Sequence, residues 1–139
     1  MIPNSFSVRT YAVCENEGKI LGLYEYHNNE LYCKLPGGGV EFGEGLLDCL
    51  HREFQEELNA EIEIIEHLYT QEEFIQSIFD STKQILIIYY IVKIKNLQDI
   101  KANCAEIQRF EWIDINNHCF SLPTDIIAVE KFKDRKKTL

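Results

Sequence analysis

Short apolar stretches, rich in β-branched and aromatic residues, recur along the chain and are separated by turn-forming residues. The first two stretches flank Glu15, Asn16, Glu17 and Gly18, a cluster that is typical of a hairpin turn. Stretches of the same character follow at intervals toward the C-terminus. The pattern predicts strands at residues 7–14, 20–26, 31–35, 61–67, 84–95 and 107–115.

A helical spacing replaces this pattern after Gly45. Apolar residues then recur at intervals of three and four, which predicts a helix with one face packed inward. Asn59 follows the last of them, and asparagine tolerates the left-handed conformation that often ends a helix. The apolar positions of this helix are Leu47, Leu50, Phe54 and Leu58.

A second helix is predicted at residues 123–133, with apolar positions at Ile126, Ile127, Val129 and Phe132. Strands followed by a helix, further strands and a last helix favour an α/β fold, in which helices cover a mixed sheet. The 139 residues suit one globular domain, so we expect a single domain over 1–139.

Composition and charge narrow the classes of function. A formal net charge of -9 argues against a protein that coats nucleic acid or anionic membranes, because such partners are bound through Lys and Arg clusters. The longest apolar run, residues 85–92, is far shorter than the roughly 20 residues of a membrane span, and no secretory signal is recognisable. The five cysteines, odd in number and widely spaced, fit neither a disulfide framework nor a zinc site. We therefore expect a cytoplasmic protein.

The chemistry-bearing residues lie in one stretch. Pro36 and the three glycines after it stop any regular element and allow close backbone approach. In the helix that follows, Glu53, Glu56 and Glu57 share one stripe beside the apolar face, where three carboxylates repel one another. Mg²⁺ binds carboxylate and carbonyl oxygens, so loop and helix together predict a metal site. The alternative is a solvated acidic helix face.

The spacing within this stretch resembles the Nudix box. It runs from Gly38 through five residues to Glu44, then seven residues to Arg52-Glu53, an apolar residue, one further residue and Glu56-Glu57. The resemblance implies an α/β/α sandwich around a mixed sheet. It also implies metal-dependent hydrolysis of a phosphoanhydride bond in a nucleoside diphosphate linked to another moiety. The sequence departs from the family pattern at the end of the box, where Asn59 replaces the usual glycine and Ala60 a larger aliphatic residue.

The resemblance also implies a metal site. Glu56 and Glu57 would bind Mg²⁺ or Mn²⁺, a backbone carbonyl of Gly37 or Gly38 would assist, and Glu53 would serve as a ligand or as the general base.

Further roles follow from position in the motif. Arg52 would orient a neighbouring glutamate, although an ion pair with Glu44 that ties loop to helix explains both residues equally well. Glu106 stands six residues before Trp112, at the spacing where the family often has a further carboxylate, and is a candidate fourth ligand or general base.

Two other functions remain open on a Nudix-like fold. A sensor could bind a nucleotide without hydrolysing it, but the complete Arg52 to Glu57 run argues against this. An isomerase of prenyl diphosphates would need a catalytic cysteine, and no cysteine here lies in a recognisable motif. The expected partner is a small nucleotide-like molecule, and a homodimer is left open. Tyr69, Phe74 and Phe79 are candidates for stacking on a base, with ordinary packing as the alternative.

Overall fold

The structure, a computed structural model, describes residues 2–137. Each predicted strand and helix is present, with ends that differ from the predicted ones by at most four residues. A short 3-10 helix, η1, lies between the last two strands. The elements are β1 (Ser5–Asn16), β2 (Lys19–His27), β3 (Glu30–Lys34), β4 (Gly37–Gly39), α1 (Leu46–Leu58), β5 (Ile62–Thr70), β6 (Lys83–Ile94), η1 (Leu97–Asp99), β7 (Ile107–Asp114) and α2 (Pro123–Lys137).

The strands form a mixed sheet in the order β3-β2-β1-β6-β5. β1 and β6 run parallel along most of their length, and the other pairs are antiparallel. β1 pairs with β2 only beside their shared turn, at Glu15 and Asn16. Beyond this turn β2 no longer pairs with β1. β1 instead pairs with β4 at Arg9 to Tyr11, and β2 pairs with β7.

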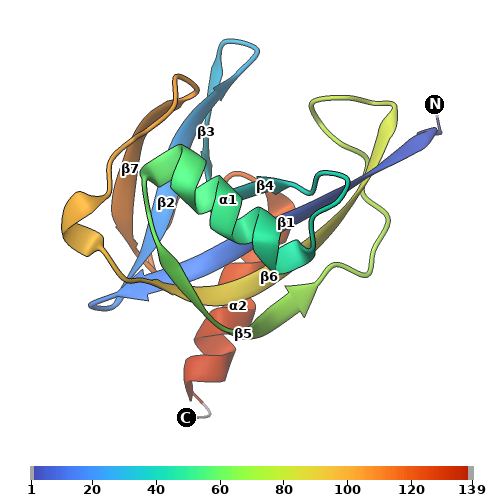
Figure 1. The fold of residues 1–139 in the computed structure, drawn as a ribbon. Coiled ribbons are helices and arrows are strands. Elements are labelled where there is room, and N and C mark those ends of the chain that lie inside the picture. Colours follow the sequence, from blue (N-terminus) through green and yellow to red (C-terminus); the bar gives the residue numbers. More distant parts are fainter. Residues whose placement is uncertain (1, 138–139) are drawn as a thin grey trace.

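A helix covers each face of the sheet (Figure 1). Successive residues of β1 point to opposite faces, as strand geometry requires. Tyr11 and Val13 therefore lie in the core beside α2, whereas Ala12 and Cys14 lie in the core beside α1. This arrangement is the expected α/β/α sandwich. The helices contribute Leu50, Phe54 and Leu58 from α1 and Ala128, Val129 and Phe132 from α2.

The ends of α1 are set by backbone geometry. The Gly45 N–H donates to the Asp48 carboxylate at 2.9 Å, which satisfies a group that the first turn leaves free. At the other end Asn59 has a φ of 55°, in the left-handed region. The prediction that Asn59 ends this helix is confirmed. No helix among residues 2–137 is long and apolar enough to cross a membrane.

The structure corrects two details of the pattern. The glycines after Pro36 do not stop regular structure, because Gly37–Gly39 form β4 against β1. Not every apolar helix position is covered: Leu47 of α1 is exposed, and so are Ile126 and Ile127 of α2. Cys49, which the spacing did not include, is buried. Regular spacing reports which side of a helix faces the core, but the neighbouring elements decide how far the covered surface extends.

Candidate active site

β4 holds the glycine segment against the acidic face of α1. Gly38 pairs with Thr10 of β1, so its backbone cannot move away from the sheet. A Cβ atom added to Gly38 would stand only 2.5 Å from the carboxyl carbon of Glu53. A glycine at this position therefore lets the Glu53 carboxylate lie directly on the backbone of the loop.

Glu57 is buried rather than solvated. Only 7% of its surface is exposed, and its Oε1 accepts a hydrogen bond from the Gly37 N–H at 3.2 Å. Burial raises the pKa of Glu57 to about 8, and the nearby charges of Glu53 and Glu25 act in the same direction. For Glu57, the alternative of a solvated helix face is therefore wrong.

Arg52 connects the carboxylates to the loop. Its guanidinium donates to Glu44 at 2.7 and 3.0 Å, to Glu53 at 2.9 Å and to Glu56 at 3.2 Å. It also donates to the Gly39 carbonyl at 3.0 Å. The hydrogen bonds from Arg52 lower the pKa of Glu44 to about 2. The ion pair between loop and helix is thus present, together with a contact that orients Glu53.

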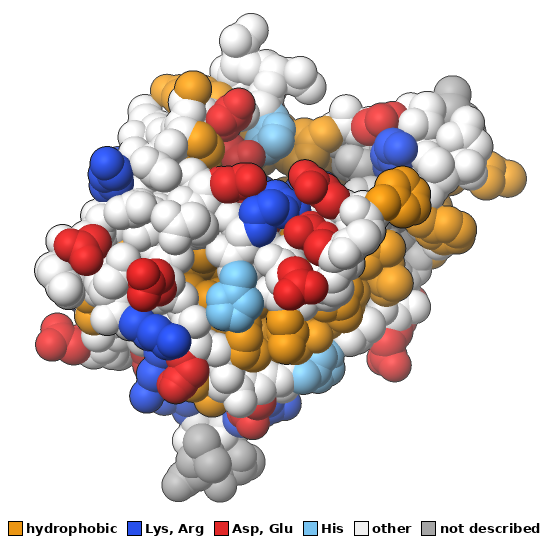
Figure 2. Space-filling view, in the orientation of Figure 1, with side chains coloured by type: hydrophobic (Ala, Val, Ile, Leu, Met, Phe, Trp, Pro, Cys, Tyr) orange, Lys and Arg blue, Asp and Glu red, His pale blue; other side chains and the backbone are white. Residues whose placement is uncertain are grey.

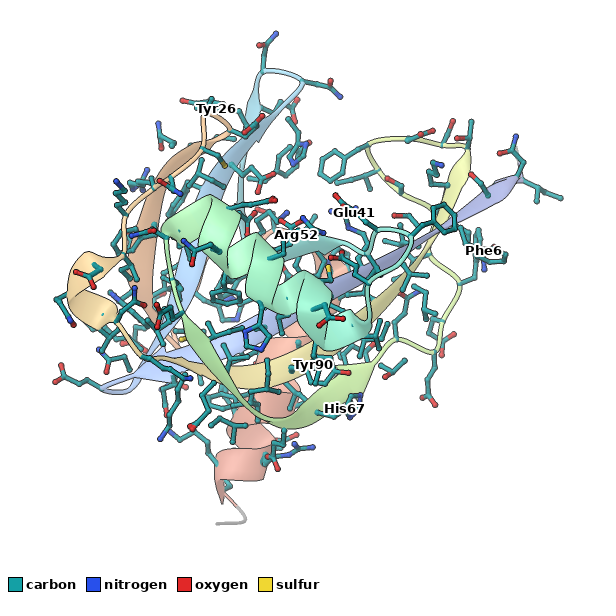
Figure 3. All side chains as sticks on the ribbon, viewed as in Figure 1. Phe6, Tyr26, Glu41, Arg52, His67 and Tyr90 are labelled. Atoms are coloured by element: carbon teal, nitrogen blue, oxygen red, sulfur yellow. The ribbon has the colours of Figure 1, made fainter. Side chains whose placement is uncertain are left out.

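The same region forms an acidic surface around this arginine (Figures 2 and 3). Carboxylates of the glycine-rich loop and of α1 gather around the guanidinium on the face of the molecule that α1 covers. Glu41 is the most exposed carboxylate that pairs with Arg52. Its Oε1 lies 3.8 Å from the Arg52 Nη1, and 70% of its side chain is exposed. A positively charged ligand can reach this group from solvent.

The donors in this group suit a divalent cation, although they are not drawn together into a cluster. Among residues 2–137, no three Asp, Glu, His or Cys side chains are grouped closely enough to hold a metal ion. Glu53 is engaged by Arg52, and Glu57 by the Gly37 N–H. Yet burial raises the pKa of both carboxyls, so the fold opposes their negative charge. Carboxylate oxygens are among the ligands that Mg²⁺ prefers.

A buried lysine, which the sequence analysis did not single out, lies beside Glu57. Lys34 is only 3% exposed, and its Nζ lies 3.3 Å from one carboxylate oxygen of Glu25. The other oxygen of Glu25 lies 3.0 Å from the His27 Nε2. Burial opposes its charge, but Tyr11, Glu25 and Glu57 together raise the pKa of Lys34 above its ordinary value. The sequence feature that could have pointed to Lys34 is its place in the otherwise apolar stretch at residues 31–35, just before the glycines.

A cavity of about 460 Å³ lies on the other side of the glycine segment. Arg9 and Tyr11 of β1 form part of its wall, and the Arg9 Nε donates to the Tyr11 hydroxyl at 2.7 Å. Arg9 also faces Glu53 and Glu25, whose charges favour its ionised form. The cavity thus adjoins the acidic group through a cation. Its other lining residues are Ser7, His27, Ile75, Gln76, Ser77, Ile78, Phe79, Asp80, Lys83, Ile85, Ile87, Leu122, Pro123 and Thr124.

A family model for the NUDIX domain matches residues 4–133. The chain belongs to the Nudix family. The match spans nearly the whole sequence, from the start of β1 to α2.

Solved structures share the fold of this Nudix protein. A NUDIX hydrolase from Nitrosomonas europaea is 18% identical, with a TM-score of 0.79, over 94% of this chain and 90% of that one. A MutT NUDIX hydrolase from Burkholderia pseudomallei is 19% identical, with a TM-score of 0.79, over 92% and 98%. An ADP-ribose pyrophosphatase from Streptococcus suis is 14% identical, with a TM-score of 0.69, over 91% of each chain. No protein of curated function matches.

The three aromatic candidates for base stacking lie in different places in this Nudix fold. Phe79 lines the cavity and stacks on His27, with ring centroids 4.2 Å apart. Tyr69 instead stacks on the core residue Tyr89, and Phe74 is exposed. Among the three, only Phe79 lies where a ligand in this cavity could contact it. A second cavity, of about 380 Å³, lies beside the β1–β2 turn and Trp112, away from the Nudix box.

Glu106 lies at the edge of the acidic group. Its loop is tied to the end of α1, because the Asn103 N–H donates to the Glu57 carbonyl at 2.8 Å. The Glu106 side chain is exposed. Burial raises the pKa of the neighbouring Cys104 thiol, and the charges of Glu106 and Glu57 act in the same direction. The structure therefore brings the loop of Glu106 to the C-terminal end of the Nudix-box helix.

Proposed function

We propose that this Nudix protein hydrolyses a phosphoanhydride bond in a nucleoside diphosphate linked to another moiety, and that the reaction requires Mg²⁺ or Mn²⁺. One observation carries the proposal. The fold buries Glu57 against the Gly37 N–H and places Glu53 on Gly38, although burial disfavours the charge of both carboxyls. Partly or fully buried carboxyls with perturbed pKa values are more typical of functional sites than of solvated surfaces.

Glu53, Glu56 and Glu57 would hold the metal, assisted by a backbone carbonyl of Gly37 or Gly38. Such a metal, when bound, polarises phosphoryl oxygens and lowers the pKa of a bound water. Arg52 would hold Glu53 and Glu56 in position, as its hydrogen bonds to both already do.

The general base would be Glu53 or Glu106, either of which could take the proton of the attacking water. Glu53 is supported by its raised pKa, which brings it closer to neutral pH. Glu106 is supported by its loop, which packs on the end of α1.

The nucleoside would occupy the cavity of about 460 Å³. Its apolar wall, with Tyr11, Phe79 and His27, suits a planar base, and Arg9 stands between this wall and Glu53, where a diphosphate would pass. Two neighbours in fold support this class of substrate, since one is described as an ADP-ribose pyrophosphatase and another as a UDP-X diphosphatase.

The test is a panel of ADP-ribose, UDP-sugars, nucleoside triphosphates and dinucleoside polyphosphates, incubated with Mg²⁺, Mn²⁺, Ca²⁺ or excess chelator. We expect hydrolysis of at least one compound with Mg²⁺ or Mn²⁺, little with Ca²⁺, whose coordination is longer and looser, and none with chelator. Glu53→Gln should lose most of the rate, whereas Glu63→Gln, an exposed change on β5, should keep it. Full turnover in chelator would refute the mechanism.

A non-hydrolytic nucleotide sensor is the second candidate. It is favoured by the lack of a preformed metal cluster among residues 2–137. Calorimetry separates the two functions, because a sensor would bind a member of the panel with Mg²⁺ present and release no product. A cytoplasmic location and a homodimer stay predictions.

A further inference from the structure

Two cysteines that are far apart in the sequence meet in the fold. Cys33 lies in β3, and Cys119 lies in the loop that joins β7 to α2. Their sulfur atoms are 2.9 Å apart, although 86 positions separate the residues. Both thiols are free in the structure. We propose that Cys33 and Cys119 form a reversible disulfide, and that this pair is a redox modification site of the protein.

The two thiols differ in their exposure to solvent, and this difference gives them different roles. Cys119 is exposed, so an oxidant in solution reaches it first. Cys33 is buried, and burial raises the pKa of its thiol well above the ordinary value. The accessible thiol therefore reacts with the oxidant, and the buried thiol resolves the product.

The backbone already holds the two segments together. The Ser121 N–H donates to the Cys33 carbonyl at 3.0 Å, and the Cys33 N–H donates to the Ser121 hydroxyl at 3.4 Å. The Tyr24 hydroxyl lies 3.0 Å from the Cys119 sulfur and donates to Glu111 at 3.2 Å. A disulfide needs the sulfurs at about 2.05 Å, so the two sulfur atoms, now 2.9 Å apart, would have to approach by less than an ångström.

Hydrogen peroxide is a sufficient oxidant for this step. The Cys119 thiol reacts with one molecule of peroxide to give a sulfenic acid and one water. The Cys33 sulfur then attacks the Cys119 sulfur, the S–S bond forms, and the sulfenic oxygen leaves with the Cys33 proton as a second water. The two sulfurs together lose two electrons, which reduce the peroxide. A dithiol reductant reverses the reaction through a mixed disulfide.

The disulfide would close a long loop and fix one wall of the large cavity. The loop that carries Cys119 continues into Leu122 and Pro123, which line that cavity. Because closing a loop of this length restricts the unfolded chain, the melting temperature of the oxidised protein should rise by about 5–15 °C. This inference is independent of the proposed function, since it rests on geometry outside the Nudix box.

The experiment treats the full chain with hydrogen peroxide and counts thiols with a colorimetric reagent in denaturant. We expect the five cysteines to lose two thiols, peptide mapping by mass spectrometry to show a Cys33–Cys119 link within one chain, and dithiothreitol to restore both the thiols and the lower melting temperature. Cys119→Ser should abolish the link and the shift. Cys104→Ser, a partly exposed thiol outside the pair, should leave both unchanged.

Three results would overturn the inference: five thiols remaining, cross-links only between chains, or irreversible sulfinic acid at Cys119 without a link. Because Cys119 is exposed, Cys119→Ser should fold, so the test needs no substitution at the buried Cys33. The hydrolase assay plays no part in it, and a chain inactive on every nucleotide would still show the link.

Discussion

Replacing Glu57 with glutamine should stabilise the metal-free protein and abolish most of its turnover. The substitution keeps the size of the side chain and an oxygen for the Gly37 N–H, but it removes the charge that burial opposes. The stability effect is not the small one expected of a helix surface, because Glu57 is only 7% exposed. The change therefore tests the burial and the chemistry of the same residue.

The size of the effect follows from the pKa. A shift from 4.5 to about 8 corresponds to on the order of 5 kcal/mol against the ionised carboxylate in the fold. The glutamine amide loses about 1–3 kcal/mol of this gain, because its N–H groups face a site built for a carboxylate. About 4 kcal/mol of this penalty acts at pH 8, where half of the folded carboxyl is protonated. We therefore expect Glu57→Gln to raise the free energy of unfolding by roughly 1–3 kcal/mol at pH 8 in chelator.

The sign of the pH dependence is fixed by the direction of the shift. Since the pKa of Glu57 is higher in the folded protein, its contribution to stability is full below pH 4.5 and is lost as the pH rises to about 8. At pH 5 the folded carboxyl is protonated and the cost of the amide remains, so the variant should be less stable than wild type by up to about 2 kcal/mol. Its advantage should be largest at pH 8. Urea unfolding at several pH values, in chelator, measures it.

Glu56→Gln is the matched control. The Glu56 side chain lies on the same helix and is 57% exposed, so its replacement should change the free energy of unfolding by no more than about 0.5 kcal/mol at either pH. Both variants should lose about 10²-fold or more in turnover with Mg²⁺, because each lacks a ligand. A stability difference that does not change with pH would refute the burial argument. A Glu57→Gln protein that melts normally and hydrolyses its best substrate at the wild-type rate would refute the site.

The remaining predictions concern three other positions. Glu106→Gln should lower the rate by more than about twofold in steady-state kinetics if its carboxylate takes part in the reaction, and a smaller change would remove it from the site. Gly38→Ala should lower turnover by about tenfold or more and change the melting temperature little, because the added Cβ would stand 2.5 Å from the Glu53 carboxyl carbon. A normal rate would show that Glu53 need not lie on the loop. Burial raises the pKa of Asp125 from 3.8 to about 6, so wild type should lose roughly 2–3 kcal/mol relative to Asp125→Asn as the pH rises from 4 to 6, and parallel urea-unfolding profiles would contradict this.

The sequence by itself determined the order of the elements and the chemistry that the chain carries. Residue composition and helix period are local properties, so β-branched and aromatic stretches predicted the strands, and apolar spacing predicted the helices. The Nudix box is also local, because helix geometry places Glu53, Glu56 and Glu57 on one side of α1 wherever the helix packs. The left-handed residue at Asn59 followed from the same kind of reasoning.

Only the tertiary structure decided which of these residues are buried and what they meet. The pairing of β4 with β1 turned a predicted irregular loop into a strand and set Gly37 against Glu57. Burial depends on the whole packed fold, so neither the raised pKa of Glu57 nor the buried Lys34 beside it could be predicted from spacing.

The cavity and the cysteine pair show the same limit over longer distances. Arg9 and Phe79 share a cavity because β6 pairs with β1 and the segment that carries Phe79 leads into β6. Cys33 and Cys119 meet because the loop before α2 returns to β3. Contacts of this kind depend on how distant segments close upon one another, which is a property of the assembled chain and leaves no periodic pattern in the sequence.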